Sequence, residues 1–338
     1  MSLDIEDPAQ LEQYLRSTRR ITPDERIEIR LLAGGVSNKA VWVTRQSGEG
    51  WVLKQALPKL RVQVDWFSDP LRIHREAAAL RWLPKIAPPG TITPLIFEDQ
   101  EHHLLAMQAV PQPHENWKTM LLAGRLHRNH VIQFAELLAR IHYGSTQHQA
   151  ELAREFDDRS FFESLRLEPY YLYSAQQEPR AARFLRDLVD ETRATRVALV
   201  HGDYSPKNIL VHNERLVLLD HEVIHWGDPA FDLGFALTHL LSKAHHLPGL
   251  RRKFLHEACG FWAVYAAEFP PDDIPSLAER AARHFLACML ARAVGRSPLE
   301  YLSDQERIRQ REIVVGQMLW RHEPVVRTMV EFVSQLPG

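Results

Sequence analysis

Residues 199–211 read Leu-Val-His-Gly-Asp-Tyr-Ser-Pro-Lys-Asn-Ile-Leu-Val, and residues 216–222 read Leu-Val-Leu-Leu-Asp-His-Glu. Two short apolar runs flank a polar break at 212–215, and this pattern predicts a β-hairpin preceded by a tight loop. Residues paired across an antiparallel hairpin lie about 5 Å apart. We therefore expect Asn208 and Asp220, at the open end of the hairpin, to lie side by side.

The polar side chains around this hairpin have the chemistry of a magnesium and phosphate site. Mg²⁺ takes a few carboxylate or amide oxygens from a protein and leaves its other positions to phosphates and water. We expect Asn208 and Asp220 to bind the metal and Glu222 to assist the metal or the substrate. Asp203, held by the bend at Gly202, lies outside that pair and is placed to orient and deprotonate an attacking hydroxyl.

The arrangement of these motifs resembles a known enzyme family. The pattern H-G-D-x4-N, then an apolar strand, then D-x-E is similar to the catalytic and metal loops of the aminoglycoside phosphotransferase and choline kinase family, small-molecule kinases with a protein-kinase-like fold. The resemblance implies a phosphotransferase that uses ATP and Mg²⁺ to phosphorylate a hydroxyl of a small-molecule acceptor. It also implies an α+β, bilobal fold, in which a five-stranded antiparallel sheet with one main helix forms the N-lobe and a larger, mostly helical C-lobe follows.

The chain has the pattern that these two lobes need. Strands are expected at 27–31, 40–43, 51–56, 91–98 and 103–107, with a helix at 70–83. A proline-broken segment follows, which divides the chain into an N-lobe at 1–108, a hinge at 109–114 and a C-lobe at 115–338. In the C-lobe we expect helices over 250–269, 274–294 and 304–332.

The turn between the first two strands is a candidate nucleotide loop. It contains Gly34, Gly35, Ser37 and Asn38. Glycine lets backbone N–H groups approach an anion closely, and the two polar side chains add donors. The turn lacks the G-x-G-x-x-G of protein kinases, and a plain hairpin turn is the alternative.

Two further positions are expected to contact the nucleotide. Lys54 interrupts an apolar strand and Glu76 borders the inward face of the next helix, so an ion pair between them would hold the ammonium over the α- and β-phosphates. A solvated edge lysine is the alternative. In the hinge, the carbonyl of Gln108 and the N–H of Val110 are expected to face adenine, whereas a plain linker would make neither contact.

A narrower resemblance concerns the acceptor. Residues 54–58, Lys-Gln-Ala-Leu-Pro, followed by Trp66, are similar to the methylthioribose kinase branch of the family. That branch implies a homodimer and substrate roles for Trp66 and Arg292, although Ala291 stands where the branch has a second arginine. A helix-bracing arginine is the alternative for Arg292. Asp232 resembles the buried aspartate that braces the family's catalytic loop.

Composition narrows the class of partner. The 338 residues include 41 Lys and Arg and 43 Asp and Glu, giving a net charge of −2. This balance gives no indication of a nucleic-acid partner. The sequence also lacks an uninterrupted apolar run of about 18 residues, so no membrane span is predicted. The chain contains only two cysteines, Cys259 and Cys288, and it starts without a leader pattern, so a reducing cytoplasm is expected. Residues 223–234 contain no Ser, Thr or Tyr, and a helix is expected from about Pro229. We therefore expect no phosphorylatable activation loop and a small-molecule acceptor.

Two other functions compete with the kinase hypothesis. The histidines at 201, 221 and 225 suggest a metallohydrolase, and His221 and His225 stand four residues apart, as zinc ligands on a helix do. A hydrolase would, however, leave Lys54 and Glu76 without a role. A catalytically silent nucleotide-binding module is the second alternative. Such a module would bind ATP but release no ADP with any acceptor.

Overall fold

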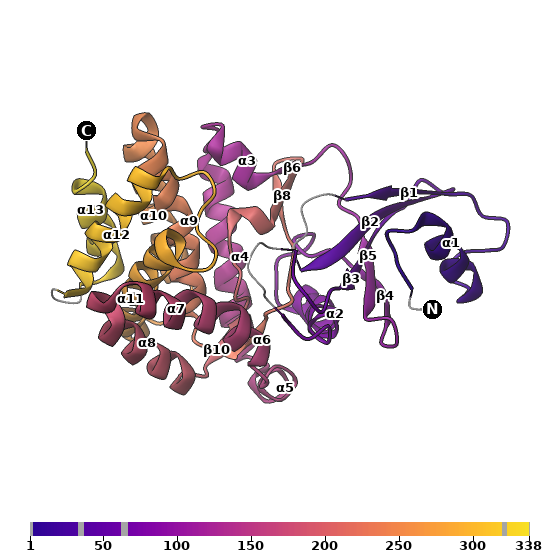
Figure 1. Ribbon diagram of the computed structural model, residues 1–338, viewed down its shortest axis with the longest axis horizontal. Helices are drawn as coiled ribbons and strands as arrows, with labels where there is room; N and C mark the ends of the chain where they lie inside the picture. The colour runs from indigo at the N-terminus through magenta and orange to yellow at the C-terminus, as the bar shows by residue number, and fades with distance from the viewer. Residues whose placement is uncertain (1–2, 33–36, 62–66, 320–322, 338) are drawn as a thin grey trace.

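The computed structural model describes residues 3–32, 37–61, 67–319 and 323–337. An antiparallel sheet forms the N-terminal part of the molecule and a mostly helical assembly forms the rest (Figure 1). This arrangement confirms the predicted fold class. The cavity described below lies between these two parts.

The N-terminal part is built on five strands in the order β1-β2-β3-β5-β4, and every neighbouring pair is antiparallel. Lys54 pairs with Ala40 on one side and with Leu105 on the other, so it occupies the middle of the sheet rather than an edge. The strands span β1 (Ile27–Leu31), β2 (Asn38–Arg45), β3 (Gly50–Ala56), β4 (Leu95–Asp99) and β5 (Leu104–Gln108).

Helices cover both faces of this sheet because successive side chains of a strand point to opposite faces. Helix α1 (Pro8–Ser17) begins at Asp7, whose side chain accepts the N–H groups of Ala9 and Gln10. Its buried leucines join the sheet residues Val41, Val43, Leu53, Leu104 and Ala106 in one core. Helix α2 (Arg72–Trp82) packs on the other face, where Leu105 and Met107 belong to a core that continues into the helical part.

The helical part begins with the short strand β6 (Glu115–Asn116). Helices α9 and α11 pack side by side at its centre, and the wholly buried residues of α9 form the middle of the main core (Figure 1). The helices are α3 (Trp117–Leu122), α4 (Arg128–Thr146), α5 (Gln149–Glu155), α6 (Ser160–Phe162), the π-helix η2 (Glu163–Leu172), α7 (Tyr173–Gln177), α8 (Ala182–Ala194), α9 (Ala230–His246), α10 (Arg251–Ala266), α11 (Ile274–Val294), α12 (Asp304–Leu319) and α13 (Val325–Ser334).

One helix differs from the sequence prediction. A single helix was expected over 304–332, but the structure has two, α12 and α13. Pro324 stands immediately before α13, and proline lacks the N–H that a continuous helix needs at this position. No helix among the described residues is long and apolar enough to cross a membrane.

The predicted hairpin is present. Strands β8 (Ile209–His212) and β9 (Arg215–Leu218) pair with Ile209 opposite Leu218. The N–H of Leu219 donates to the carbonyl of Asn208 at 2.9 Å, so the backbones of Asn208 and the residue before Asp220 are in direct contact. Short strands on either side, β7 (Ala198–Val200) and β10 (His225–Gly227), pair with each other and hold the ends of the segment together.

Asp232 of α9 holds the loop between β7 and β8 in place by hydrogen bonds to its backbone. The carboxylate of Asp232 is fully buried and accepts the N–H of His201 at 2.6 Å and the N–H of Gly202 at 2.8 Å. His142 of α4 also contacts it at 3.2 Å. Gly202 has a φ of +76°, and a Cβ there would meet Val223 at 2.9 Å, which accounts for glycine at this bend.

Replacing Asp232 with alanine removes the acceptor of two buried N–H groups. Because buried donors without partners are costly, we expect Asp232→Ala to lower the free energy of unfolding by about 2–4 kcal/mol in urea denaturation. Asp187→Ala, at an exposed position of α8, is the matched control and should change it by less than about 0.5 kcal/mol. Equal losses in both variants would contradict the bracing role.

The contribution of Asp232 should also depend on pH. Burial alone would raise the pKa of Asp232. The hydrogen bond and charge of His142, together with the charge and the backbone N–H of His201, hold this pKa below its ordinary value. A carboxyl with a depressed pKa stabilises the folded state above its unfolded pKa of about 3.9, and this stabilisation is lost as the pH falls further. The stability difference between the wild type and Asp232→Ala should therefore be constant near neutral pH and shrink below about pH 4, as urea titrations at several pH values would show.

Candidate active site

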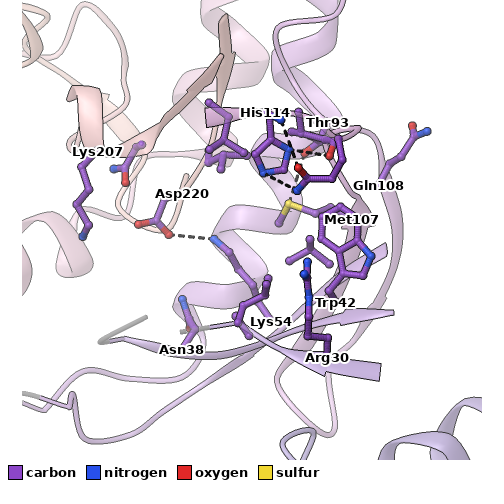
Figure 2. Close-up of a pocket in the computed structure, with 18 of the residues that line it drawn as sticks. Arg30, Asn38, Trp42, Lys54, Thr93, Met107, Gln108, His114, Lys207 and Asp220 are labelled. Carbon is purple, nitrogen blue, oxygen red and sulfur yellow. Dashed lines mark hydrogen bonds and ion pairs between the residues drawn. The ribbon is translucent and has the colours of Figure 1, made fainter. Parts of the chain in front are cut away.

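A cavity of about 340 Å³ separates the sheet from the helical part. In Figure 2, Arg30, Asn38, Trp42 and Lys54 approach it from the sheet, whereas Lys207 and Asp220 approach it from the opposite side. Ser37, Gln108, Val110 and Asn208 also line it. The cavity thus brings together seven of the fourteen candidate site residues, although they are far apart in the chain.

Lys54 is the only lysine of β3, and two carboxylates hold its ammonium. Nζ lies 2.7 Å from Oε1 of Glu76 on α2 and 3.0 Å from Oδ1 of Asp220 (Figure 2 shows the second contact). The Lys54–Glu76 ion pair is therefore present as predicted. Burial by itself would lower the pKa of Lys54, but Asp220 and Glu76 raise it above its ordinary value, so the side chain is a fixed cation.

Asp220 is held in an unusual backbone conformation. Its φ is +69°, in the left-handed region that few residues other than glycine adopt, although aspartate and asparagine tolerate it. Burial would raise the pKa of its carboxyl, but Lys54 and Lys207 lower it, so Asp220 is ionised at neutral pH. The strained backbone at the end of the hairpin directs an anionic oxygen into the cavity beside Lys54.

Asp203 lies in the loop between β7 and β8, where its side chain is next to that of Asn208. The amide Nδ2 of Asn208 donates to Oδ2 of Asp203 at 2.8 Å and to its carbonyl at 3.0 Å. The guanidinium of Arg166 approaches the same Oδ2 at 3.0 Å. Both contacts use Oδ2, so Oδ1 is the oxygen that these partners leave for a hydroxyl. Because Nδ2 of Asn208 is occupied, its Oδ1 is the atom of that amide suited to a metal.

Arg166 was missed by the sequence analysis. It is buried on η2, and its Nε also donates to the carbonyl of Gly202 at 2.7 Å. Burial would raise the pKa of Asp203, but Arg166 and Lys207 hold it below its ordinary value. No motif surrounds Arg166 in the sequence, because its position is set by the tertiary packing of η2 against the catalytic loop.

Glu222 takes part in a buried network rather than lining the cavity. Its Oε2 accepts from Nε of Arg72 and from Nδ2 of Asn38, each at 3.1 Å. Arg72, which is fully buried, also donates to the carbonyls of Ser37 and Leu57. The network joins the segment after the hairpin to the start of β2, and the role of Glu222 as a metal ligand stays a prediction.

The far end of the cavity is aromatic. The Trp42 ring lies 6.4 Å from the His114 ring, and the Arg30 guanidinium lies 5.5 Å from the Trp42 ring. Nδ1 of His114 is 3.0 Å from the carbonyl of Val110. In Figure 2 the side chain of Gln108 points away from the cavity, which leaves its backbone to face a ligand. Trp42 and His114 were not predicted, because a strand tryptophan and a linker histidine carry no functional signal alone.

Four of the expected site residues have other outcomes. Gly34, Gly35 and Trp66 lie outside the described residues, so their assigned roles stay predictions. Arg292 of α11 is buried in the helical part and does not line the cavity beside Lys54. The described residues contain no group of three or more His, Cys, Asp or Glu side chains arranged to hold a metal ion. Their donor set is instead an amide oxygen from Asn208 and a carboxylate from Asp220, which suits a metal that also binds phosphates.

The comparisons with known proteins agree with this geometry. The methylthioribose kinase of Pectobacterium atrosepticum is 25% identical over 309 residues, which cover 74% of this chain and 75% of the relative. The methylthioribose kinase of Erwinia tasmaniensis is 27% identical over 297 residues, which cover 74% of this chain and 72% of the relative.

Solved structures share the fold. The ethanolamine kinase of Plasmodium vivax superposes with a TM-score of 0.59 at 12% identity, covering 96% of this chain and 91% of that chain. An amicoumacin kinase in complex with AMP-PNP and Ca²⁺ gives a TM-score of 0.57 at 15% identity and covers 95% of both chains. A family model described as the phosphotransferase enzyme family matches residues 28–268, which include the sheet and the catalytic hairpin. The chain therefore belongs to the phosphotransferase enzyme family, as the motifs around Asp203 predicted, and it is a small-molecule kinase.

Proposed function

We propose that this kinase transfers the γ-phosphate of ATP to a hydroxyl of a small molecule with the help of Mg²⁺. The observation that carries the proposal is that Lys54, Asn208 and Asp220 all line one cavity, while the side chain of Asp203 is hydrogen-bonded to that of Asn208. These are the groups that phosphoryl transfer needs: a cation for the phosphates, oxygens for a metal and a carboxylate for the acceptor.

The donor nucleotide fits the cavity in one orientation. Adenine would lie at the aromatic end, between Trp42 and the backbone of Gln108 and Val110, and the phosphates would extend toward Lys54. Lys54 would bind the α- and β-phosphates because Glu76 keeps its ammonium in place. Ser37 and Asn38, which also line the cavity, would donate to phosphate oxygens.

Magnesium would be held by Oδ1 of Asn208 and the carboxylate of Asp220. A site of two protein ligands completed by phosphate oxygens and water is the usual arrangement for Mg²⁺ in kinases. When bound, the ion neutralises charge on the phosphates. The chain's own contribution is to fix both oxygen ligands through the hairpin and the left-handed backbone of Asp220.

In the reaction, the acceptor oxygen attacks the γ-phosphorus and the bond from that phosphorus to the β,γ-bridging oxygen breaks, so ADP leaves with the electron pair. The hydroxyl proton passes to Asp203. Its pKa below the ordinary value keeps it ionised and able to accept a hydrogen bond from the hydroxyl. Arg166 and Asn208 hold the carboxylate in place, so catalysis comes mainly from positioning and charge.

The acceptor is a small molecule because the segment after the hairpin offers no platform for a peptide. Residues 223–236 are buried throughout. We further expect the enzyme to act in a reducing cytoplasm, since Cys259 and Cys288 are both free thiols. The homodimer expected from the methylthioribose kinase branch stays a prediction.

Removing the Lys54 ammonium should weaken nucleotide binding. Charged hydrogen bonds contribute about 1.5–3 kcal/mol, so Lys54→Met is expected to raise the Kd for Mg·ATP by about 10- to 100-fold in isothermal titration calorimetry. Lys253→Met, at an exposed position of α10, is the matched control and should leave the Kd unchanged. An unaltered Kd in Lys54→Met would place the phosphates elsewhere.

Removing the Asp203 carboxylate should separate chemistry from binding. Asp203→Asn is expected to bind Mg·ATP as the wild type does, while kcat for ADP release with an acceptor falls by about 10²–10⁴-fold. Asp187→Asn should retain full activity. If Asp203→Asn turned over the acceptor at the wild-type rate, the assigned role of Asp203 would be refuted. A separate outcome concerns the unmodified protein: if it bound Mg·ATP but released no ADP with any sugar, sugar phosphate, hydroxy acid, aminoglycoside or amino alcohol, it would be a silent module.

A further inference from the structure

Helix α9 carries a row of side chains that leads away from the catalytic loop. Beyond Asp232, the residues Phe235, His239 and Lys243 follow at four-residue intervals, which places them on one face of the helix. Arg292 of α11 packs against this face. Its guanidinium lies 5.2 Å from the Phe235 ring, and its Nη2 lies 3.4 Å from Nε2 of His239.

A chain of side-chain contacts links this row to Asp203. The Tyr170 ring stands between two guanidinium groups, 5.6 Å from that of Arg166 and 4.9 Å from that of Arg292. Arg166 in turn contacts the carboxylate of Asp203. Arg292 is close enough for its charge to help lower the pKa of Asp203. The sequence of contacts thus connects the proposed base to Arg292 without passing through the nucleotide cavity.

The charges of this cluster are not balanced by acids. Arg292 is 8% exposed, and its Nη1 donates to the carbonyl and hydroxyl of Ser297 at 2.8 and 3.0 Å, while its Nε has no partner among the described residues. Lys243 is 0% exposed, and its Nζ donates to the carbonyl of His239 at 2.9 Å. Within the described ranges neither side chain forms an ion pair with a carboxylate.

The other buried cations of the described chain behave differently. Arg72 is paired with Glu222, and Arg166 is paired with Asp203. Burying a charge without a counter-ion is costly, so two basic side chains that lack a carboxylate partner in one cluster call for an explanation. Burial is the main cause that lowers the pKa of Lys243 to about 7, with Lys118 and Arg292 adding to it and Glu300 opposing it. An anion bound here would supply the missing counter-charge.

We propose that the acceptor carries an anionic group, a carboxylate or a phosphate, which binds at Arg292 and Lys243 while its hydroxyl reaches Asp203. This inference rests on the proposed function. A protonated amine, as in aminoglycosides and amino alcohols, would be repelled by the same cluster. The substrate class is therefore a hydroxy acid or a phosphorylated hydroxyl compound.

The test uses inorganic phosphate and acetate as probes of the anion site. Each is titrated calorimetrically into the full chain saturated with Mg·AMP-PNP, so that the nucleotide cavity is already filled. We expect saturable binding of at least one probe, and the stronger of the two identifies the group as phosphate or carboxylate. Arg292→Gln and Lys243→Met should each weaken that binding by about 10- to 100-fold. Arg296→Gln, which removes a more exposed arginine of the same segment, should not.

Lys243→Met keeps the inference testable even if Arg292→Gln fails to fold. Methionine has a similar shape and no charge, so this variant should be as stable as the wild type or more stable, yet should bind the anion less well. No saturable binding of either probe, or equal binding in all variants, would overturn the proposal. In an ADP-release screen, anionic acceptors should be preferred, and a preferred cationic acceptor would also overturn it.

The outcome is separable from that of the proposed function. If Mg·AMP-PNP binds and the anions do not, the anion site is refuted while the nucleotide site stands. If Mg·AMP-PNP does not bind, the same titrations on the nucleotide-free Lys54→Met variant measure the anion site alone, because the proposed phosphate-binding ammonium is absent there.

Discussion

The ion pair between Lys54 and Asp220 spans the cavity and joins the two parts of the molecule. Lys54 comes from the centre of the sheet and Asp220 from the end of the hairpin, and their side chains meet at 3.0 Å. Each partner is fixed independently, Lys54 by Glu76 and Asp220 by its left-handed backbone. A triphosphate with its metal ion needs positive charge on one side and oxygen ligands on the other. The ion pair therefore marks the position where that ligand can bridge both parts.

The second constraint is the rigidity of the catalytic loop. Asp232 secures the backbone of the loop from within the core, and Arg166 and Asn208 secure the side chain of Asp203. A carboxylate bonded on one oxygen presents the other in a defined direction. In a transfer reaction that depends on positioning more than on covalent chemistry, this direction is the main contribution of the protein at the acceptor end.

Much of the site was predictable because it is local or motif-based. The hairpin fixes Asn208 and Asp220 relative to each other, and alternation in the strands placed Lys54 in an apolar run where a lysine is unusual. The fold class was implied by the resemblance of the catalytic motifs, and the expected order of five strands and one helix before a proline-broken segment agreed with it. The residues that the sequence analysis missed act through contacts between distant parts of the chain. Arg72 and Arg166 act through contacts with residues 150 and 37 positions away, and no sequence pattern marks them. The unpaired charges of Arg292 and Lys243 become visible only when burial and partners are known.

The central claim is that Lys54, Asn208 and Asp220 bind a single Mg²⁺–nucleotide complex beside Asp203. A crystal structure of the full chain with Mg²⁺ and AMP-PNP tests it most directly. The account predicts an ion about 2.0–2.1 Å from Oδ1 of Asn208 and from a carboxylate oxygen of Asp220, the usual Mg–O distance, with Lys54 hydrogen-bonded to the α- or β-phosphate. A nucleotide whose metal contacts neither Asn208 nor Asp220, or whose phosphates lie away from Lys54, would contradict it.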